Sequence, residues 1–191
     1  METKTQQQIL DNRKENQVCY ITSLLGVQIL SQEIIKRELN VISIREPKTQ
    51  RDGDIQSQYH NINELYGDRC FSVYFQDIDF ISKTSNLISP KKNQIKSILD
   101  WAKNKYQENN KMFVVHCFAG ISRSSAVAML INYIANGDLF APYDVRFHSP
   151  NKLILEFGAE ILGFDSTSVI NKIKAISNAY FAGEEYRYEI F

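Results

Sequence analysis

The sequence predicts an α/β fold in which a central, mostly parallel sheet of about four to five strands is flanked by helices. Two observations point to this fold. From Val18 onward, short β-branched and aromatic runs alternate with stretches of helical periodicity. The chain has 191 residues, 43% of them apolar, which suits one domain with a substantial core. We therefore expect a single domain over residues 18–191, preceded by a polar tail or loosely docked helix over residues 1–17.

Four short runs of β-branched and aromatic residues are the expected strands. They are Val18–Ile21, Val41–Ile44, Phe71–Phe75 and Met112–Val115. Between the first two strands, apolar residues recur at near-helical spacing, at Val27, Leu30, Ile34, Ile35 and Leu39. Residues 45–67 are polar and turn-rich, which predicts a long surface excursion of a kind that is often functional. The sequence leaves open whether this excursion is a substrate lid.

Helices are expected in the second half of the chain. Pro90 opens the first of them, and its apolar face consists of Ile95, Ile98, Leu99 and Ala102. A second helix is expected over residues 122–136 and ends at Gly137. Two further amphipathic helices are expected after Pro150 and after Asp165.

The charge balance restricts the classes of partner. The 22 Lys and Arg side chains match the 22 Asp and Glu side chains, so the formal net charge is zero. A protein that binds nucleic acid or an anionic membrane over a broad surface needs an excess of Lys and Arg. This chain has no such excess, so we expect neither as a partner. Three cysteines without a C-x-x-C pair favour a reducing compartment, and no apolar run approaches a membrane span. A cytoplasmic protein with, at most, a focused anion site is expected.

The segment from residue 112 to residue 125, MFVVHCFAGISRSS, combines a strand, a small-residue loop and the start of a helix. Such a junction binds anions through loop N–H groups and the helix dipole. Cys117 stands at the base of the loop, where converging N–H groups favour a thiolate. Arg123 carries a fork that can bind two phosphoryl oxygens. Gly120 allows a tight turn, and Ser122 or Ser124 can cap the helix or place a hydroxyl near the sulfur.

These residues resemble the signature of the cysteine-dependent protein tyrosine phosphatase superfamily, His-Cys-x5-Arg-[Ser/Thr]. The form HCxxGxSRS is most similar to the dual-specificity branch and its compact prokaryotic tyrosine-phosphatase-like relatives. The helix SSAVAMLINYIA and the later pair Pro150-Asn151 also resemble those relatives. The resemblance is specific over about residues 70–163 and implies a cysteine-dependent phosphatase fold for the domain.

The resemblance implies phosphoric monoester hydrolysis through a phosphocysteine intermediate, with phosphotyrosine as the substrate and phosphoserine and phosphothreonine as an open extension. Cys117 would be the nucleophile and Arg123 the phosphate clamp. His116 would tune the thiolate from behind, while Ser124 and Asn151 would support the loop. No metal or other cofactor is implied. The residues expected to bind the substrate phosphate are Phe118, Ala119, Gly120, Ile121, Ser122 and Arg123.

The family also supplies an aspartic general acid from a loop upstream of the signature. Here that loop is FQDIDF, and both Asp77 and Asp79 stand about forty residues before Cys117. Relatives commonly show a phenylalanine, one residue and then the acid, which favours Asp77. Asp79 remains the alternative.

Other functions stay open on the sequence alone. The expected substrate is a phosphorylated protein or a small phosphomonoester, because the loop between Cys117 and Arg123 contains no Lys, Arg or His for a polyanion. The alternatives are a phosphoinositide, inositol phosphate or RNA 5′-phosphate hydrolase and a catalytically weak phosphate-binding module. Cys19 and Cys70 are expected to be buried hydrophobes, with a resolving thiol for an oxidised Cys117 as the lesser alternative. Tyrosine-only against dual specificity and the oligomeric state are also left open.

Overall fold

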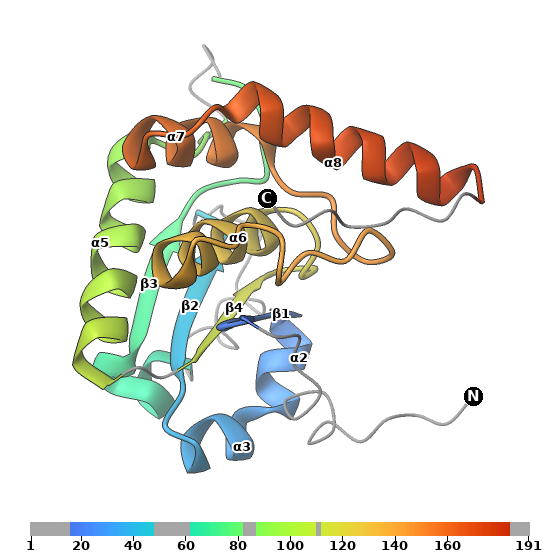
Figure 1. Ribbon diagram of the computed structural model, residues 1–191. Helices are drawn as coiled ribbons and strands as arrows, with labels where there is room; N and C mark the ends of the chain where they lie inside the picture. Colours follow the sequence, from blue (N-terminus) through green and yellow to red (C-terminus); the bar gives the residue numbers. More distant parts are fainter. Residues whose placement is uncertain (1–15, 48–61, 82–86, 110–111, 184–191) are drawn as a thin grey trace.

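Four parallel strands form one sheet in the order β1-β4-β2-β3. The computed structural model describes residues 16–47, 62–81, 87–109 and 112–183 (Figure 1). The strands are β1 (Cys19–Ser23), β2 (Asn40–Arg45), β3 (Cys70–Tyr74) and β4 (Phe113–Cys117). Each lies within two residues of its expected position. The predicted α/β fold is confirmed, and all the strand pairs in the described part of the chain are parallel.

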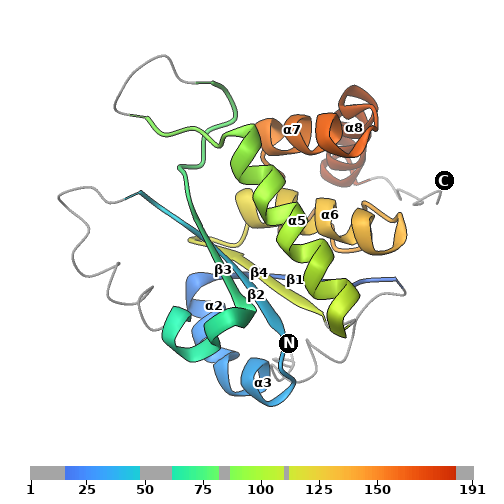
Figure 2. The same ribbon diagram turned by 90° about the vertical axis from the view of Figure 1, so that its left-hand side faces the viewer.

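Helices of the second half of the chain lie on one side of the sheet (Figures 1 and 2). They are α5 (Lys92–Asn109), α6 (Arg123–Asn136), α7 (Lys152–Leu162) and α8 (Ser166–Phe181). The predicted apolar face of α5 is buried in the larger core, which also contains Ile42 and Ile44 of β2 and Val115 of β4. Gly137 ends α6 in the left-handed conformation, as expected. Within the described ranges, no helix is long and apolar enough to cross a membrane.

The opposite side of the sheet is covered by α2 (Leu24–Ile29), α3 (Ser31–Lys36) and the helical residues 62–66. The helical stretch expected between β1 and β2 is therefore present but divided, because the chain bends at Leu30 between two short helices. A short 3-10 helix, η1 (Gly67–Arg69), leads into β3. Most of the predicted surface excursion, residues 48–61, and most of the predicted N-terminal tail, residues 1–15, lie outside the described residues.

The parallel arrangement brings the carboxyl ends of the strands to one edge of the sheet. Ser23 of β1 is in register with Cys117 of β4, and Arg45 of β2 is in register with Tyr74 of β3. The segments that follow these strands therefore start from the same edge. Ligands of open α/β sheets bind outside this edge, so the functional site is sought there.

Candidate active site

The signature loop, residues 117–123, connects the end of β4 to the start of α6. Its tight turn occurs at Gly120, which has a φ of +76°. A Cβ atom at this position would lie 2.6 Å from the carbonyl carbon of Thr22 and 2.7 Å from the nitrogen of Ser23. Both atoms are backbone at the end of β1, so neither can move aside. The loop can therefore take this path only with glycine at position 120.

Neighbouring segments hold the signature loop by its carbonyl oxygens. The N–H of Leu24 donates to the carbonyl of Phe118 at 3.2 Å. The N–H of Ser149 donates to the carbonyl of Ile121 at 3.1 Å, and the N–H of Asn151 donates to that of Ser122 at 3.2 Å. These bonds turn the three carbonyls towards the surrounding chain. These three carbonyl oxygens are therefore occupied, and the N–H of Gly120 points to the sulfur at the base of the loop.

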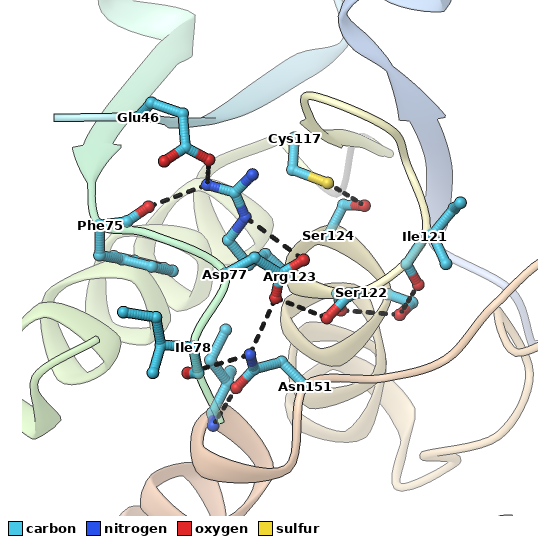
Figure 3. Close-up of polar contacts among 12 residues, drawn as sticks. Glu46, Phe75, Asp77, Ile78, Cys117, Ile121, Ser122, Arg123, Ser124 and Asn151 are labelled. Atoms are coloured by element: carbon cyan, nitrogen blue, oxygen red, sulfur yellow. Dashed lines mark hydrogen bonds and ion pairs between the residues drawn. The ribbon is translucent and has the colours of Figure 1, made fainter. Parts of the chain in front are cut away.

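Cys117 lies at the base of this loop and is 1% exposed. Its Sγ accepts a hydrogen bond from the N–H of Gly120 at 3.3 Å and lies 3.3 Å from the hydroxyl of Ser124 (Figure 3). Both groups can donate to a sulfur anion. The positive end of the α6 dipole adds to this field. The expected hydroxyl near the sulfur is thus present, and it belongs to Ser124.

His116 is fully buried beneath the loop. Burial lowers the pKa of its imidazole to about 4, and the nearby charges of Arg45 and Arg123 also lower it, while the hydrogen bond with the backbone of Cys117 raises it. At neutral pH the ring is therefore uncharged. It lies at the end of β4 beside Cys117 and adds no positive charge there.

The guanidinium of Arg123 is held in one orientation. Its Nη1 donates to the carbonyl of Phe75 at 2.9 Å and forms an ion pair with Oε1 of Glu46 at 2.6 Å (Figure 3). Within the described residues, its buried Nε has no hydrogen-bond partner. Nη1 is occupied by these two partners, and Nε faces Oδ2 of Asp77 at 3.9 Å, so a ligand would approach the Nε–Nη2 edge beside that carboxylate. That edge is a fork that matches two oxygens of a phosphoryl group.

Glu46 was not among the site residues predicted from the sequence. It follows β2 directly and so starts from the same edge of the sheet as the signature loop. Its place at the carboxyl end of a buried parallel strand was the available signal. Glu46 stands at the start of a polar stretch, and nothing in the sequence distinguishes its carboxylate from the other polar residues there.

Asp77 lies over the signature loop on the segment that follows β3. Its Oδ1 accepts hydrogen bonds from the hydroxyl of Ser122 at 2.7 Å and from Nδ2 of Asn151 at 3.0 Å. Its Oδ2 lies 3.9 Å from Nε of Arg123. Both carboxylates are exposed, but in the described part of the chain the side chain of Asp79 has no hydrogen bond to the signature loop. The structure thus brings Asp77, and not Asp79, to the loop (Figure 3).

Ser122, predicted to bind the phosphate or cap the helix, and Asn151, predicted to support the loop, each make a contact that the sequence did not suggest. Ser122 occupies the N-cap position of α6, but its hydroxyl makes no capping bond and donates to Asp77 instead. Asn151 was expected to hold the signature loop, and its backbone N–H does so. Its buried side chain also donates from Nδ2 to the carbonyl of Ile78 at 3.2 Å, which holds the segment that carries Asp77. The same side chain caps α7 by accepting from the N–H of Ile154.

The other two cysteines lie away from Cys117. Cys19 begins β1 and is level with Phe113, four residues before Cys117 along the neighbouring strand. At about 3.3 Å per residue this separation is roughly 13 Å, beyond disulfide reach. Cys70 begins β3, two strands away from β4. The role of resolving thiol is therefore wrong for both in this fold. Among the described residues, no group of three His, Cys, Asp or Glu side chains could hold a metal ion.

No protein-family model matches the sequence, and no curated protein matches it. Among solved structures, PTPMT1 is 14% identical and aligns with a TM-score of 0.52 over 79% of this chain and 95% of its own. PTPMT1 in complex with PI(5)P gives the same TM-score over 80% and 96%. The PTP-2 phosphatase of Cydia pomonella, also 14% identical, aligns with a TM-score of 0.49 over 76% and 86%. The likeness to PTPMT1 shows that the chain has the protein tyrosine phosphatase fold.

Proposed function

We propose that this chain is a phosphoric monoester hydrolase that dephosphorylates phosphotyrosine, with phosphoserine and phosphothreonine as further substrates, through a phosphocysteine intermediate. The single observation that carries the proposal is the convergence of three groups on one loop. Cys117 Sγ receives donors from Gly120 and Ser124. Glu46 orients the guanidinium of Arg123 through Nη1, and the carboxylate of Asp77 lies beside its Nε. This set supplies a nucleophile, a phosphate clamp and a proton donor.

In the first step, the Cys117 thiolate attacks phosphorus in line with the leaving oxygen. The S–P bond forms as the P–O bond breaks, and the departing oxygen takes a proton from the carboxylic acid of Asp77. Charge on the equatorial oxygens is bound by the Nε–Nη2 edge of Arg123 and by loop N–H groups. The contacts that Asp77 makes with the loop support it over Asp79 as the acid.

In the second step, water attacks the phosphocysteine. The Asp77 carboxylate accepts a proton from the water as the new P–O bond forms and the S–P bond breaks. The electron pair returns to sulfur, and the hydroxyl of Ser124 and the N–H of Gly120 donate to the departing thiolate. Phosphate then leaves, and the resting site is restored.

A protein substrate is favoured by the side chains of the loop. Phe118, Ala119, Gly120, Ile121 and Ser122 carry no positive charge that would select a polyphosphorylated ring. A phosphoinositide is the second candidate, because one of the solved structures of PTPMT1 is a complex with PI(5)P. Three free thiols among the described residues support a reducing compartment, and we place the enzyme in the cytoplasm.

The test is hydrolysis of para-nitrophenyl phosphate in the presence of a chelator. We expect turnover that vanadate inhibits and that Cys117→Ser lowers by at least about a thousandfold. The matched control is Cys19→Ser, a buried thiol outside the site, which should keep its turnover. Retained phosphopeptide binding without turnover in the wild-type chain would instead identify a phosphate-binding module. Preferential turnover of inositol phosphates would overturn the protein substrate.

A further inference from the structure

Six large apolar side chains around the signature loop are exposed to solvent. Each has between 46% and 68% of its surface exposed. We call them the apolar rim: Leu25, Phe80, Ile81, Phe118, Ile121 and Phe147. Single exposed apolar residues are ordinary on a protein surface, but a group of them around one site marks an interaction surface.

Hydrogen bonds place the segments of the rim next to one another. Phe118 and Ile121 belong to the signature loop. The bond from Leu24 N–H to the Phe118 carbonyl brings the first turn of α2, and with it Leu25, to one side of the loop. The bond from Ser149 N–H to the Ile121 carbonyl brings the segment of Phe147 to another side.

The remaining part of the rim belongs to residues 77–81, which we call the acid segment after Asp77. Asn151 Nδ2 donates to the carbonyl of Ile78, and Ser122 donates to Asp77, so this segment also lies against the loop (Figure 3). Phe80 and Ile81 come directly after these anchored residues and are 56% and 68% exposed. Four segments thus surround the phosphate site with apolar surface. The groups on either side of a phosphate bound at Cys117 would come next to these segments.

The charges beside the rim distinguish between the kinds of substrate that could carry apolar groups. Outside the signature loop, Arg146 is the one Lys or Arg in the rim segments 24–26, 77–81 and 144–149. Its guanidinium pairs with Asp144 at 2.6 Å. The carboxylates of Asp77 and Asp79 lie in the acid segment. An anionic bilayer is attracted by clustered cations, and this surface offers carboxylates beside one paired arginine. A neutral apolar segment of a protein fits it better.

We propose that the apolar rim binds large apolar side chains that flank the phosphorylated residue of a protein substrate. The inference rests on the proposed phosphatase function and adds a specificity determinant to it. The rim buries the flanking side chains, while the signature loop binds the phosphate. Phosphorylated residues in extended segments rich in Leu, Ile and Phe are then the preferred substrates, and those in polar segments are poor ones.

The experiment compares two phosphotyrosine peptides of equal length and net charge, one with Leu and Phe beside the phosphorylated residue and one with Ser and Asn. We expect kcat/KM to be at least about tenfold higher for the apolar peptide, chiefly through KM. Phe147→Ser and Phe80→Ser should each reduce this preference by at least about threefold. The control variant Phe181→Ser, which removes an exposed aromatic at the end of α8, should keep the preference.

Binding of the same peptides to the Cys117→Ser variant separates this inference from the proposed function. Tighter binding of the apolar peptide supports the rim even if the wild-type chain hydrolyses nothing, in which case only the proposed function fails. Equal binding of the two peptides overturns the rim as a specificity determinant, even if both are hydrolysed. Faster hydrolysis of a phosphoinositide in phosphatidylcholine vesicles than of the apolar peptide also overturns the inference, because the rim would then serve a lipid surface.

Discussion

The signature loop and the acid segment are built in different ways. The loop is seven consecutive residues between β4 and α6, and its path is fixed by one glycine against the end of β1. The acid segment depends on residues remote in sequence. Asp77 is held by Ser122, 45 residues away, and by Asn151, 74 residues away. A motif search can find the loop, whereas the position of the acid follows only from the packed chain.

Arg123 depends both on the signature loop and on segments remote in sequence. Arg123 is the last residue of the loop, yet its guanidinium is oriented by Glu46 at the end of β2 and by the carbonyl of Phe75 after β3. The local motif therefore supplies the chemical groups, and the segments that follow β2 and β3 orient the guanidinium. Single substitutions can separate these two contributions.

Among the substitutions that separate the loop from the remote segments, the largest effect is expected at Asp77, the proposed general acid. Asp77→Asn should lower kcat for phenyl phosphate by about a hundredfold to ten-thousandfold, because the phenolate then leaves without a proton. Asp79→Asn, its matched control two residues on, should lower kcat less than about threefold. The measurement is steady-state kinetics with both variants on phenyl phosphate and on para-nitrophenyl phosphate, whose leaving group needs protonation less. Equal losses in the two variants would contradict the assignment of Asp77.

The next prediction concerns the buried imidazole of His116 and its effect on the free energy of unfolding. The pKa of His116 is lowered from 6.5 to about 4 in the folded chain, so the unfolded chain binds more protons between these values. The free energy of unfolding should therefore fall as the pH drops from about 6.5 to about 4, with about 3 kcal/mol lost to this group. Urea unfolding at a series of pH values measures it. His116→Gln should flatten this part of the profile, and an unchanged slope would argue against a buried neutral imidazole.

The sequence predicted the sheet because its strands are continuous apolar runs bounded by turn residues, as in Val41–Ile44, and it predicted α5 because one apolar face has helical spacing. It predicted Cys117 and Arg123 as site residues because both belong to one short motif between a strand and a helix. It favoured Asp77 but kept Asp79 as the alternative, and it did not find Glu46, because the contacts of these carboxylates join segments that are remote in sequence. The break at Leu30 was also invisible, since apolar spacing continues through it.

A smaller loss is expected where the sheet orients the arginine. Glu46→Gln removes the charge that pairs with Nη1 of Arg123 and leaves the Phe75 carbonyl as the remaining partner of that nitrogen, so the Nε–Nη2 edge is held less firmly. We expect kcat/KM for para-nitrophenyl phosphate to fall by about tenfold to a hundredfold. Glu33→Gln, which breaks a carboxylate–arginine pair with Arg37 on α3, is the control and should leave the kinetics unchanged. A normal rate in Glu46→Gln would show that the loop alone orients Arg123.

The smallest effect is expected at the one contact that joins the two regions directly. Ser122 belongs to the loop, and its hydroxyl donates to the carboxylate of Asp77 at 2.7 Å. In Ser122→Ala, Asn151 still donates to this carboxylate, so the side chain of Asp77 is held less firmly but stays at the site. We expect kcat to fall by about tenfold for phenyl phosphate and by much less for para-nitrophenyl phosphate, because only the first reaction depends on a well-placed proton.

Two comparisons make the Ser122 result decisive. Ser97→Ala, which removes an exposed hydroxyl from α5, should change neither rate. In the double variant Ser122→Ala/Asp77→Asn, the serine should contribute almost nothing further, because its partner no longer carries the proton. An equal loss on both substrates would mean that Ser122 acts through the shape of the loop. A loss confined to phenyl phosphate would mean that the loop places the acid, and that the remote segment is then positioned in part by the motif itself.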